Sequence, residues 1–183
     1  MKLIAYLALA VLAGPFSAFA FDAGPSVGSV LPALTVQDAS GAPRDLAGLV
    51  GKKGVVLVFF RSARWCPFCQ AQLMSLKEVQ PSLAQRGYSL AAISYDPPGA
   101  LADFAAKRSI GYTLLSDDGS KMIDAMGLRD PQYPKGSFAY GVPRPSIFIV
   151  SRRGVIVGKL AEEGYRVRPT NAAILQAVDS VKP

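Results

Sequence analysis

Apolar residues fall along the chain in two alternating patterns, short continuous runs and runs with helical spacing. Residues 54–60 read GVVLVFF, and such a β-branched run is typical of a strand buried on both faces. Residues 88–96, YSLAAISYD, predict a second strand of this kind. After each run, apolar positions recur every three or four residues, from 69 to 83 and again from 101 to 105. Pro81 lies inside the first helical pattern and is expected to kink or shorten that helix. Strands and helices that alternate in this way indicate an α/β fold.

The segments before residue 54 and after residue 111 predict further strands of the sheet and further helices that pack on it. Residues 34–46 predict an N-terminal β-hairpin around a Ser-Gly turn, and residues 146–161 predict a second hairpin. Residues 112–128 predict a short extended piece, a turn and a short helix. Thr170 is the expected N-cap of a closing helix that runs to residue 181. We therefore expect a central mixed β-sheet flanked by helices, with the N-terminal hairpin as an extension.

Residues 1–20, MKLIAYLALAVLAGPFSAFA, have the composition of a secretory signal peptide. Lys2 supplies a positive start, an apolar stretch follows to Ala13, and a Gly-Pro pair ends it. We predict cleavage after Ala20, which leaves residues 21–183 as a single domain that is periplasmic or secreted. The apolar stretch is shorter than the roughly 20 residues that a membrane-spanning helix needs. Attachment to a membrane is therefore expected only if this segment stays uncleaved.

Composition narrows the chemistry that the chain can perform. The chain has 183 residues, half of them apolar, and a formal charge of +7. Its Lys and Arg residues are scattered instead of forming a basic stripe with interleaved aromatic residues, which argues against a nucleic-acid partner. It contains no histidine and only two cysteines, so the usual ligands of zinc, copper and haem are missing. We expect no metal and no cofactor other than a redox-active disulfide.

Both cysteines lie in the sequence WCPFC, residues 65–69, shortly after the first predicted buried strand. Cys66 is expected at the first turn of the helix that follows, where free backbone N–H groups and the helix dipole stabilise an anion. This position lowers the pKa of Cys66 and makes its thiolate a nucleophile near neutral pH. Pro67 suits a first helical turn, and Phe68 fills the second spacer position. Cys69, one turn further, is expected to attack a mixed disulfide and resolve it.

The motif RWCPFC resembles the active-site turn of thioredoxin-like oxidoreductases. Residues 103–128 are similar to the redoxin branch of that superfamily, the peroxiredoxin-like AhpC/TSA proteins. The resemblance implies a thioredoxin-like fold. It also implies that Pro145, in the sequence GVPRPSIFIV, is a cis-proline that lies beside the cysteine pair and positions a substrate. The expected substrate-binding surface is completed by five further residues: Arg64, Trp65, Pro67, Phe68 and Arg144.

The chain departs from those families at several positions. Peroxiredoxins carry Thr or Ser three residues before the reactive cysteine and Pro seven residues before it, where this chain has Ala63 and Phe59. Their peroxide-activating arginine aligns with Pro145, which leaves Arg144 one place away. Thioredoxins keep a buried acid six residues before the first cysteine, where this chain has Phe60. These departures argue against efficient peroxidase chemistry and leave the group that deprotonates the second cysteine unnamed.

The sequence favours an exported thiol–disulfide oxidoreductase, in which Cys66 forms a mixed disulfide and Cys69 releases it. Its partners would be protein or small-molecule thiols and disulfides, with an external dithiol as electron donor or acceptor. One alternative is a thiol peroxidase that reduces hydroperoxides through Cys66. Another is a thioredoxin-fold module that binds Cu(I) through the two thiolates. Residues 130–145, rich in Pro, Gly and Tyr, are interpreted as a surface loop that forms a lip for a partner.

Overall fold

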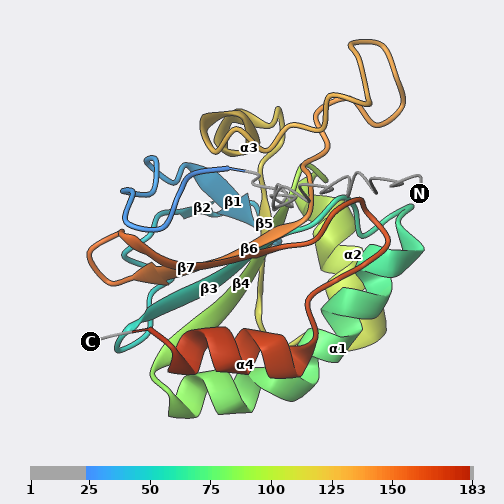
Figure 1. Ribbon diagram of the computed structural model, residues 1–183. Coiled ribbons are helices and arrows are strands. Elements are labelled where there is room, and N and C mark those ends of the chain that lie inside the picture. The colour runs from blue at the N-terminus through green and yellow to red at the C-terminus, as the bar shows by residue number, and fades with distance from the viewer. Residues whose placement is uncertain (1–23, 182–183) are drawn as a thin grey trace, which may run out of the picture.

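The computed structural model describes residues 24–181. The expected signal peptide and its cleavage site lie outside the described residues. No helix between residues 24 and 181 is both long enough and apolar enough to cross a membrane. This part of the chain folds around one β-sheet with helices on its two faces (Figure 1).

Strands and helices follow one another in the order that the hydrophobic pattern predicts. The strands of the described chain are β1 (Val36–Asp38), β2 (Pro43–Arg44), β3 (Gly54–Phe59), β4 (Tyr88–Ser94), β5 (Thr113–Ser116), β6 (Ser146–Ser151) and β7 (Ile156–Ala161). Its helices are α1 (Pro67–Gln85), α2 (Pro98–Arg108), α3 (Lys121–Ala125) and α4 (Asn171–Asp179). The predicted hairpins are β1–β2 and β6–β7. Thr170 caps α4 as expected, because its side chain accepts the N–H of Ala173.

All these strands belong to one sheet, in the order β2-β1-β5-β4-β3-β6-β7. Strands β3, β4 and β5 run parallel, and β6 runs antiparallel to β3. Phe59 at the end of β3 pairs with Ile93 near the end of β4, so the two strands end together at one edge of the sheet. In open α/β sheets this carboxyl edge carries the binding groups. The structure confirms the expected mixed sheet with helices on its faces and an N-terminal hairpin.

Strand β3 is buried on both faces because each face meets its own apolar layer. Val56 and Val58 point into the layer that α1, α2 and α4 cover. Leu57 and Phe59 point into the opposite layer, which includes Ile123 of α3. Since successive side chains of a strand alternate between faces, the continuous apolar run of β3 fills both layers at once.

Helix α1 continues through Pro81, so of the two expected effects, a kink or a shorter helix, the shortening is wrong. The helix runs unbroken over Pro67–Gln85. Leu76, Val79 and Leu83 on its inner face are almost completely buried. Burial of these side chains offsets the backbone hydrogen bond that is lost at the proline.

The carboxylate of Asp38 holds the β1–β2 hairpin closed. It accepts hydrogen bonds from the Ser40 hydroxyl at 2.6 Å and the Ser40 N–H at 2.9 Å. The Arg44 Nε atom donates to it at 2.7 Å. The Ser40 hydroxyl and the Arg44 guanidinium outweigh the effect of burial and lower the pKa of Asp38 from 3.8 to about 2.

We expect Asp38→Asn to lower the free energy of unfolding at pH 7 by about 1 kcal/mol, because the amide loses charge-assisted bonds. The folded protein keeps the carboxylate charged at pH values where the unfolded chain already protonates it. The stabilisation is therefore complete above about pH 4 and is lost as the pH falls toward 2. Urea unfolding of both proteins between pH 2 and pH 7 measures this difference. A difference that is independent of pH in that range would contradict the prediction.

Candidate active site

Cys66 lies where the loop after β3 meets helix α1. It is the N-cap residue of α1, and its Sγ atom accepts the N–H of Cys69 at 3.2 Å. Pro67 occupies the first position of the helix, as the sequence predicts. The two sulfurs form a disulfide, and the Cα atoms of the two cysteines are 5.2 Å apart. Cys66 is 2% exposed and Cys69 is completely buried, so neighbouring residues cover both sulfurs of the disulfide.

A buried aspartate that follows β4 fixes the loop that carries Cys66. The carboxylate of Asp96 accepts the Ala63 N–H at 2.7 Å, the Ser62 hydroxyl at 2.8 Å and the Ser94 hydroxyl at 3.0 Å. Burial raises the pKa of Asp96, against the lowering effect of these hydrogen bonds. Because β3 and β4 end at the same edge of the sheet, Asp96 is placed to hold the turn that leads into α1.

The guanidinium of Arg61 lies inside a cluster of aromatic rings next to the cysteine turn. Its Cζ atom is 5.1 Å from the ring centroid of Trp65, 4.9 Å from that of Tyr133 and 4.5 Å from that of Tyr165. The Arg61 Nη2 atom donates to the Tyr133 hydroxyl at 2.5 Å. Phe138 packs edge-on against Trp65, with ring centroids 5.4 Å apart. Contact with three rings stabilises a buried cation that has no carboxylate partner within residues 24–181.

Arg168 brings a second guanidinium to the sulfurs, from the segment between β7 and α4. Its Nη2 atom lies 3.5 Å from the Sγ atom of Cys69, and its Nε atom donates to the Gln72 side-chain oxygen at 3.1 Å. Burial, and then the nearby charge of Arg61, lower the pKa of Arg168 to about 10. The group therefore still carries its charge near neutral pH.

Four of the predicted substrate-binding residues, Arg64, Trp65, Pro67 and Phe68, lie next to the two cysteines in sequence. Arg64 and Phe68 are exposed, and Trp65 is half-buried with its Nε1 atom donating to the Tyr95 hydroxyl at 3.0 Å. The ring of Phe68 meets that of Tyr165 at 6.1 Å. A hollow of about 510 Å³ opens beside the turn and is lined by Arg64, Trp65, Tyr95, Asp96, Pro97 and Phe138. The turn of residues 65–69 is called the redox turn below. A small molecule or a side chain of a partner has room next to it.

Pro145 precedes β6, and here the structure corrects an expectation. Every peptide bond between residues 24 and 181 is trans, so the expected cis bond at Pro145 is wrong. The chain enters β6 in an extended path that backbone contacts fix. The Arg144 N–H donates to the Leu128 carbonyl at 2.7 Å, and Arg129 pairs with Pro143 as an antiparallel bridge. A trans bond, the ordinary state of the chain, satisfies this path.

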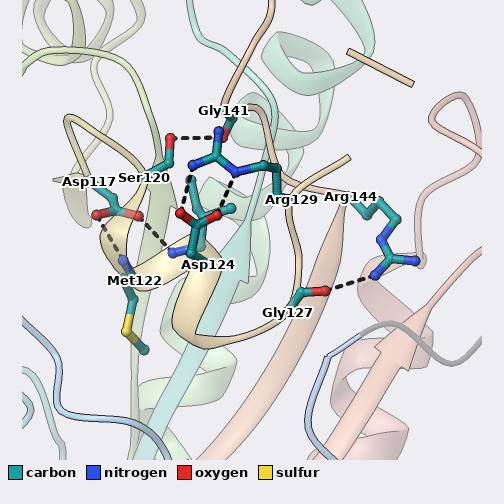
Figure 2. Close-up of polar contacts among 9 residues, drawn as sticks. Asp117, Ser120, Met122, Asp124, Gly127, Arg129, Gly141 and Arg144 are labelled. Carbon is teal, nitrogen blue, oxygen red and sulfur yellow. Dashed lines mark hydrogen bonds and ion pairs between the residues drawn. The ribbon is translucent and has the colours of Figure 1, made fainter. Parts of the chain in front are cut away.

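Arg144 belongs to the corner that α3 makes with the chain leading into β6 (Figure 2). Its Nη2 atom donates to the Gly127 carbonyl at 2.8 Å. Beside it, Arg129 forms a two-bond ion pair with Asp124 at 2.5 and 2.6 Å. Asp117 accepts two backbone N–H groups at the start of α3. These contacts hold Arg144 at this corner, where it lines a hollow of about 140 Å³ together with Pro145 and Tyr165. Its role in binding a substrate stays a prediction.

The 130–145 segment projects from the body of the molecule as a loop of turns (Figure 1). Two of its aromatic side chains reach the redox turn, since Tyr133 contacts Arg61 and Phe138 contacts Trp65. Phe138 is 78% exposed. The loop therefore lies beside the redox turn, while its role as a partner-binding lip stays a prediction.

Sequence patterns miss Asp96, Tyr165 and Arg168. Asp96 does carry a signal, because it is a charged residue at the end of the second strand predicted to be buried. Arg168 carries none, because it lies 99 residues from Cys69 in a segment without hydrophobic period. At the position where thioredoxins keep an acid, Phe60 is completely buried.

A cysteine pair that opens a helix at the carboxyl edge of a mixed sheet defines a thioredoxin-like redox protein. A profile of the AhpC/TSA family matches residues 27–159, and the chain therefore belongs to the AhpC/TSA family. The putative peroxiredoxin bcp of Haemophilus influenzae is 30% identical over 132 residues, which are 72% of this chain and 83% of that protein. Peroxiredoxin Bcp of Escherichia coli is 29% identical over 122 residues, which are 67% of this chain and 77% of that protein.

Solved structures show the same fold. The peroxidoxin BcpB of Mycobacterium tuberculosis superposes with a TM-score of 0.72 at 22% identity, over 88% of this chain and 100% of that one. Peroxiredoxin Q of Xanthomonas campestris superposes with a TM-score of 0.67 at 20% identity, over 80% of this chain and 90% of that one. Fold and family together identify the chain as an oxidoreductase whose relatives are peroxiredoxins.

Proposed function

We propose that the protein is a thiol peroxidase that reduces hydroperoxides with Cys66 and forms a disulfide with Cys69. The Cys66 thiolate attacks one peroxide oxygen, the O–O bond breaks, and the other oxygen leaves with a proton as water or an alcohol. Cys66 is then a sulfenic acid. The Cys69 sulfur displaces the hydroxyl group as water and forms the disulfide. An external dithiol reduces this disulfide by exchange and is itself oxidised.

The observation that carries this proposal is the cysteine pair at the start of α1 in a chain of the AhpC/TSA family. The sulfur of Cys66 accepts the N–H of Cys69 and lies at the positive end of a helix of 19 residues. A thiolate is favoured over a thiol at this position. The relatives named peroxiredoxin support a hydroperoxide as the oxidant. The proposal thus replaces thiol–disulfide exchange, which the sequence alone favours, with the peroxidase alternative.

One observation favours thiol–disulfide exchange as a second candidate. Ala63 has no hydroxyl where peroxiredoxins carry one, and its N–H is bound to Asp96. Ala63 therefore has no free hydrogen-bond donor for a peroxide beside Cys66. In this second reaction the Cys66 thiolate attacks a protein or small-molecule disulfide, and Cys69 releases the mixed disulfide.

Reduced protein mixed with one equivalent of hydrogen peroxide separates the two candidates. We expect both thiols to be lost within seconds, as counted by mass spectrometry after acid quenching and alkylation. The matched reaction uses one equivalent of glutathione disulfide in place of peroxide. Oxidation that takes hours with peroxide and minutes with glutathione disulfide would overturn the peroxidase proposal in favour of exchange.

We also propose that the protein works outside the cytosol after residues 1–20 are removed. The charged start, the apolar stretch and the small residues before Phe21 support this. An intact-mass measurement on protein from the native host should give a chain that begins at Phe21. A cytosolic protein that retains Met1 would refute export.

A further inference from the structure

Arg168 lies beside the disulfide, and Arg61 lies in the aromatic cluster next to the cysteine turn. Among residues 24–181, neither Arg61 nor Arg168 forms an ion pair with Asp or Glu, whereas three other arginines do. Burial of an unpaired charge is unfavourable. The rings around Arg61 compensate part of its charge, but Arg168 directs its Nη2 atom at the Sγ atom of Cys69. A disulfide sulfur is only a weak acceptor, so the contact at Nη2 stabilises the charge of Arg168 only weakly in the oxidised protein.

The other contacts of Arg168 hold its guanidinium in this orientation. Its Nε atom donates to the Gln72 side chain at 3.1 Å. Its Nη1 atom donates to the Val167 carbonyl at 2.8 Å and to the Tyr165 carbonyl. Gln72 is buried and lies three residues after Cys69 on α1, so both side chains share one helix face. The guanidinium is therefore anchored from two sides, with one nitrogen directed at the sulfur.

We infer that Arg168 is the counter-ion of the Cys69 thiolate in the reduced protein. Reduction turns the weak sulfur acceptor into an anion, and the contact at Nη2 becomes a charge-assisted hydrogen bond. A neighbouring cation favours the thiolate, which is the form of the sulfur that attacks. Arg168 thereby activates the resolving cysteine, in a site where Phe60 replaces the buried acid of thioredoxins. The inference rests on the proposed function only in taking Cys69 as the resolving residue.

In the resolving step, the Cys69 sulfur bonds to the Cys66 sulfur while the S–O bond of the sulfenic acid breaks. The hydroxide that leaves takes up a proton and becomes water, so the negative charge passes from sulfur to solvent. Of the charged and titratable groups, Arg168 contacts the Cys69 sulfur and Cys66 is bonded to it. Arg61 is near enough to Arg168 to lower its pKa, and the Tyr165 ring packs against Arg61. No carboxylate of residues 24–181 contacts the sulfur to oppose the effect of Arg168.

The titration of Cys69 tests this inference directly. The variant Cys66→Ser leaves Cys69 as the only thiol, and the ultraviolet absorbance of the thiolate follows its ionisation against pH. In this background we expect Arg168→Met to raise the apparent pKa of Cys69 by about one unit or more. Arg168→Lys keeps a cation and should restore part of the shift. Arg166→Met is the matched control, since this exposed arginine contacts only Tyr165, and it should leave the titration unchanged.

A second variant, Gln72→Glu, adds a negative charge beside Arg168 and leaves the Arg168 side chain in place. Gln72→Glu places a carboxylate next to the Nε atom of Arg168, so the arginine gains a permanent counter-ion. We expect the pKa of Cys69 to rise in this variant as well, although Arg168 keeps its carbonyl contacts. If neither Arg168→Met nor Gln72→Glu moves the titration, Arg168 only anchors its segment and the inference is overturned.

Kinetics with both cysteines present separate this inference from the proposed function. In Arg168→Met and Gln72→Glu we expect Cys66 to react with peroxide at about the wild-type rate. Disulfide formation should be about tenfold slower near neutral pH, because less of Cys69 is ionised. If the wild-type protein does not react with peroxide but the pKa of Cys69 shifts in the two variants, the peroxidase proposal fails and the counter-ion assignment stands. If peroxide reacts within seconds and the resolving step keeps its rate in both variants, the assignment alone fails.

Discussion

Cys66→Ser is expected to abolish peroxide consumption, with a single-turnover rate at least about a thousandfold below that of the reduced wild type. A serine hydroxyl stays protonated at neutral pH and is a poor nucleophile toward peroxide. The same hydroxyl still caps α1 by accepting the N–H of Cys69, so the fold should be retained. The measurement is the hydrogen peroxide that remains after mixing with one equivalent of protein.

Cys69→Ser is the matched variant for this prediction. We expect Cys66 to react at nearly the wild-type rate in it, but the sulfenic acid persists and can be trapped by a carbon nucleophile. With excess peroxide the trapped yield falls as sulfinic acid forms. The opposite pattern, a reactive Cys66→Ser and an inert Cys69→Ser, would reverse the roles assigned to the two sulfurs.

Asp96→Ala is expected to lower the free energy of unfolding by about 3 kcal/mol, the largest effect predicted for a polar side chain of this protein. Alanine leaves the Ala63 N–H and the hydroxyls of Ser62 and Ser94 without their shared acceptor. These groups are buried, so water does not replace the lost bonds at low cost. Urea unfolding at pH 7 measures the change.

Two comparisons make the Asp96 prediction specific. Asp103→Ala removes an exposed carboxylate from α2 and should change stability by less than about 0.5 kcal/mol. Asp96→Asn keeps one oxygen acceptor and should fall between Asp96→Ala and the wild type. A loss below about 1 kcal/mol in Asp96→Ala would show that other groups hold the turn before Cys66.

The sheet and the redox turn could be predicted because their signals are local. The apolar run that became β3 differs in period from the helical pattern that became α1, and the junction between them places Cys66. The short helix α3 and both hairpins follow from turn residues between apolar pieces. In each case, residues close in sequence decide the conformation.

Contacts between distant segments could not be predicted in the same way. The local penalty at Pro81 suggests a shorter α1, but burial of its inner face against the sheet and α4 sustains the helix. Family likeness suggests a cis bond at Pro145, whereas backbone contacts with Leu128 and Arg129 set an extended trans path. Arg168 meets Cys69 only because the chain after β7 passes over the start of α1.

The disulfide joins residues only three positions apart, within one turn of α1. A bridge this short removes little freedom from the unfolded chain and therefore adds little to stability. The cross-link itself should consequently contribute little to any difference in melting temperature between oxidised and reduced protein. Any difference in stability between the two redox forms must therefore come from the sulfur atoms and the groups that contact them.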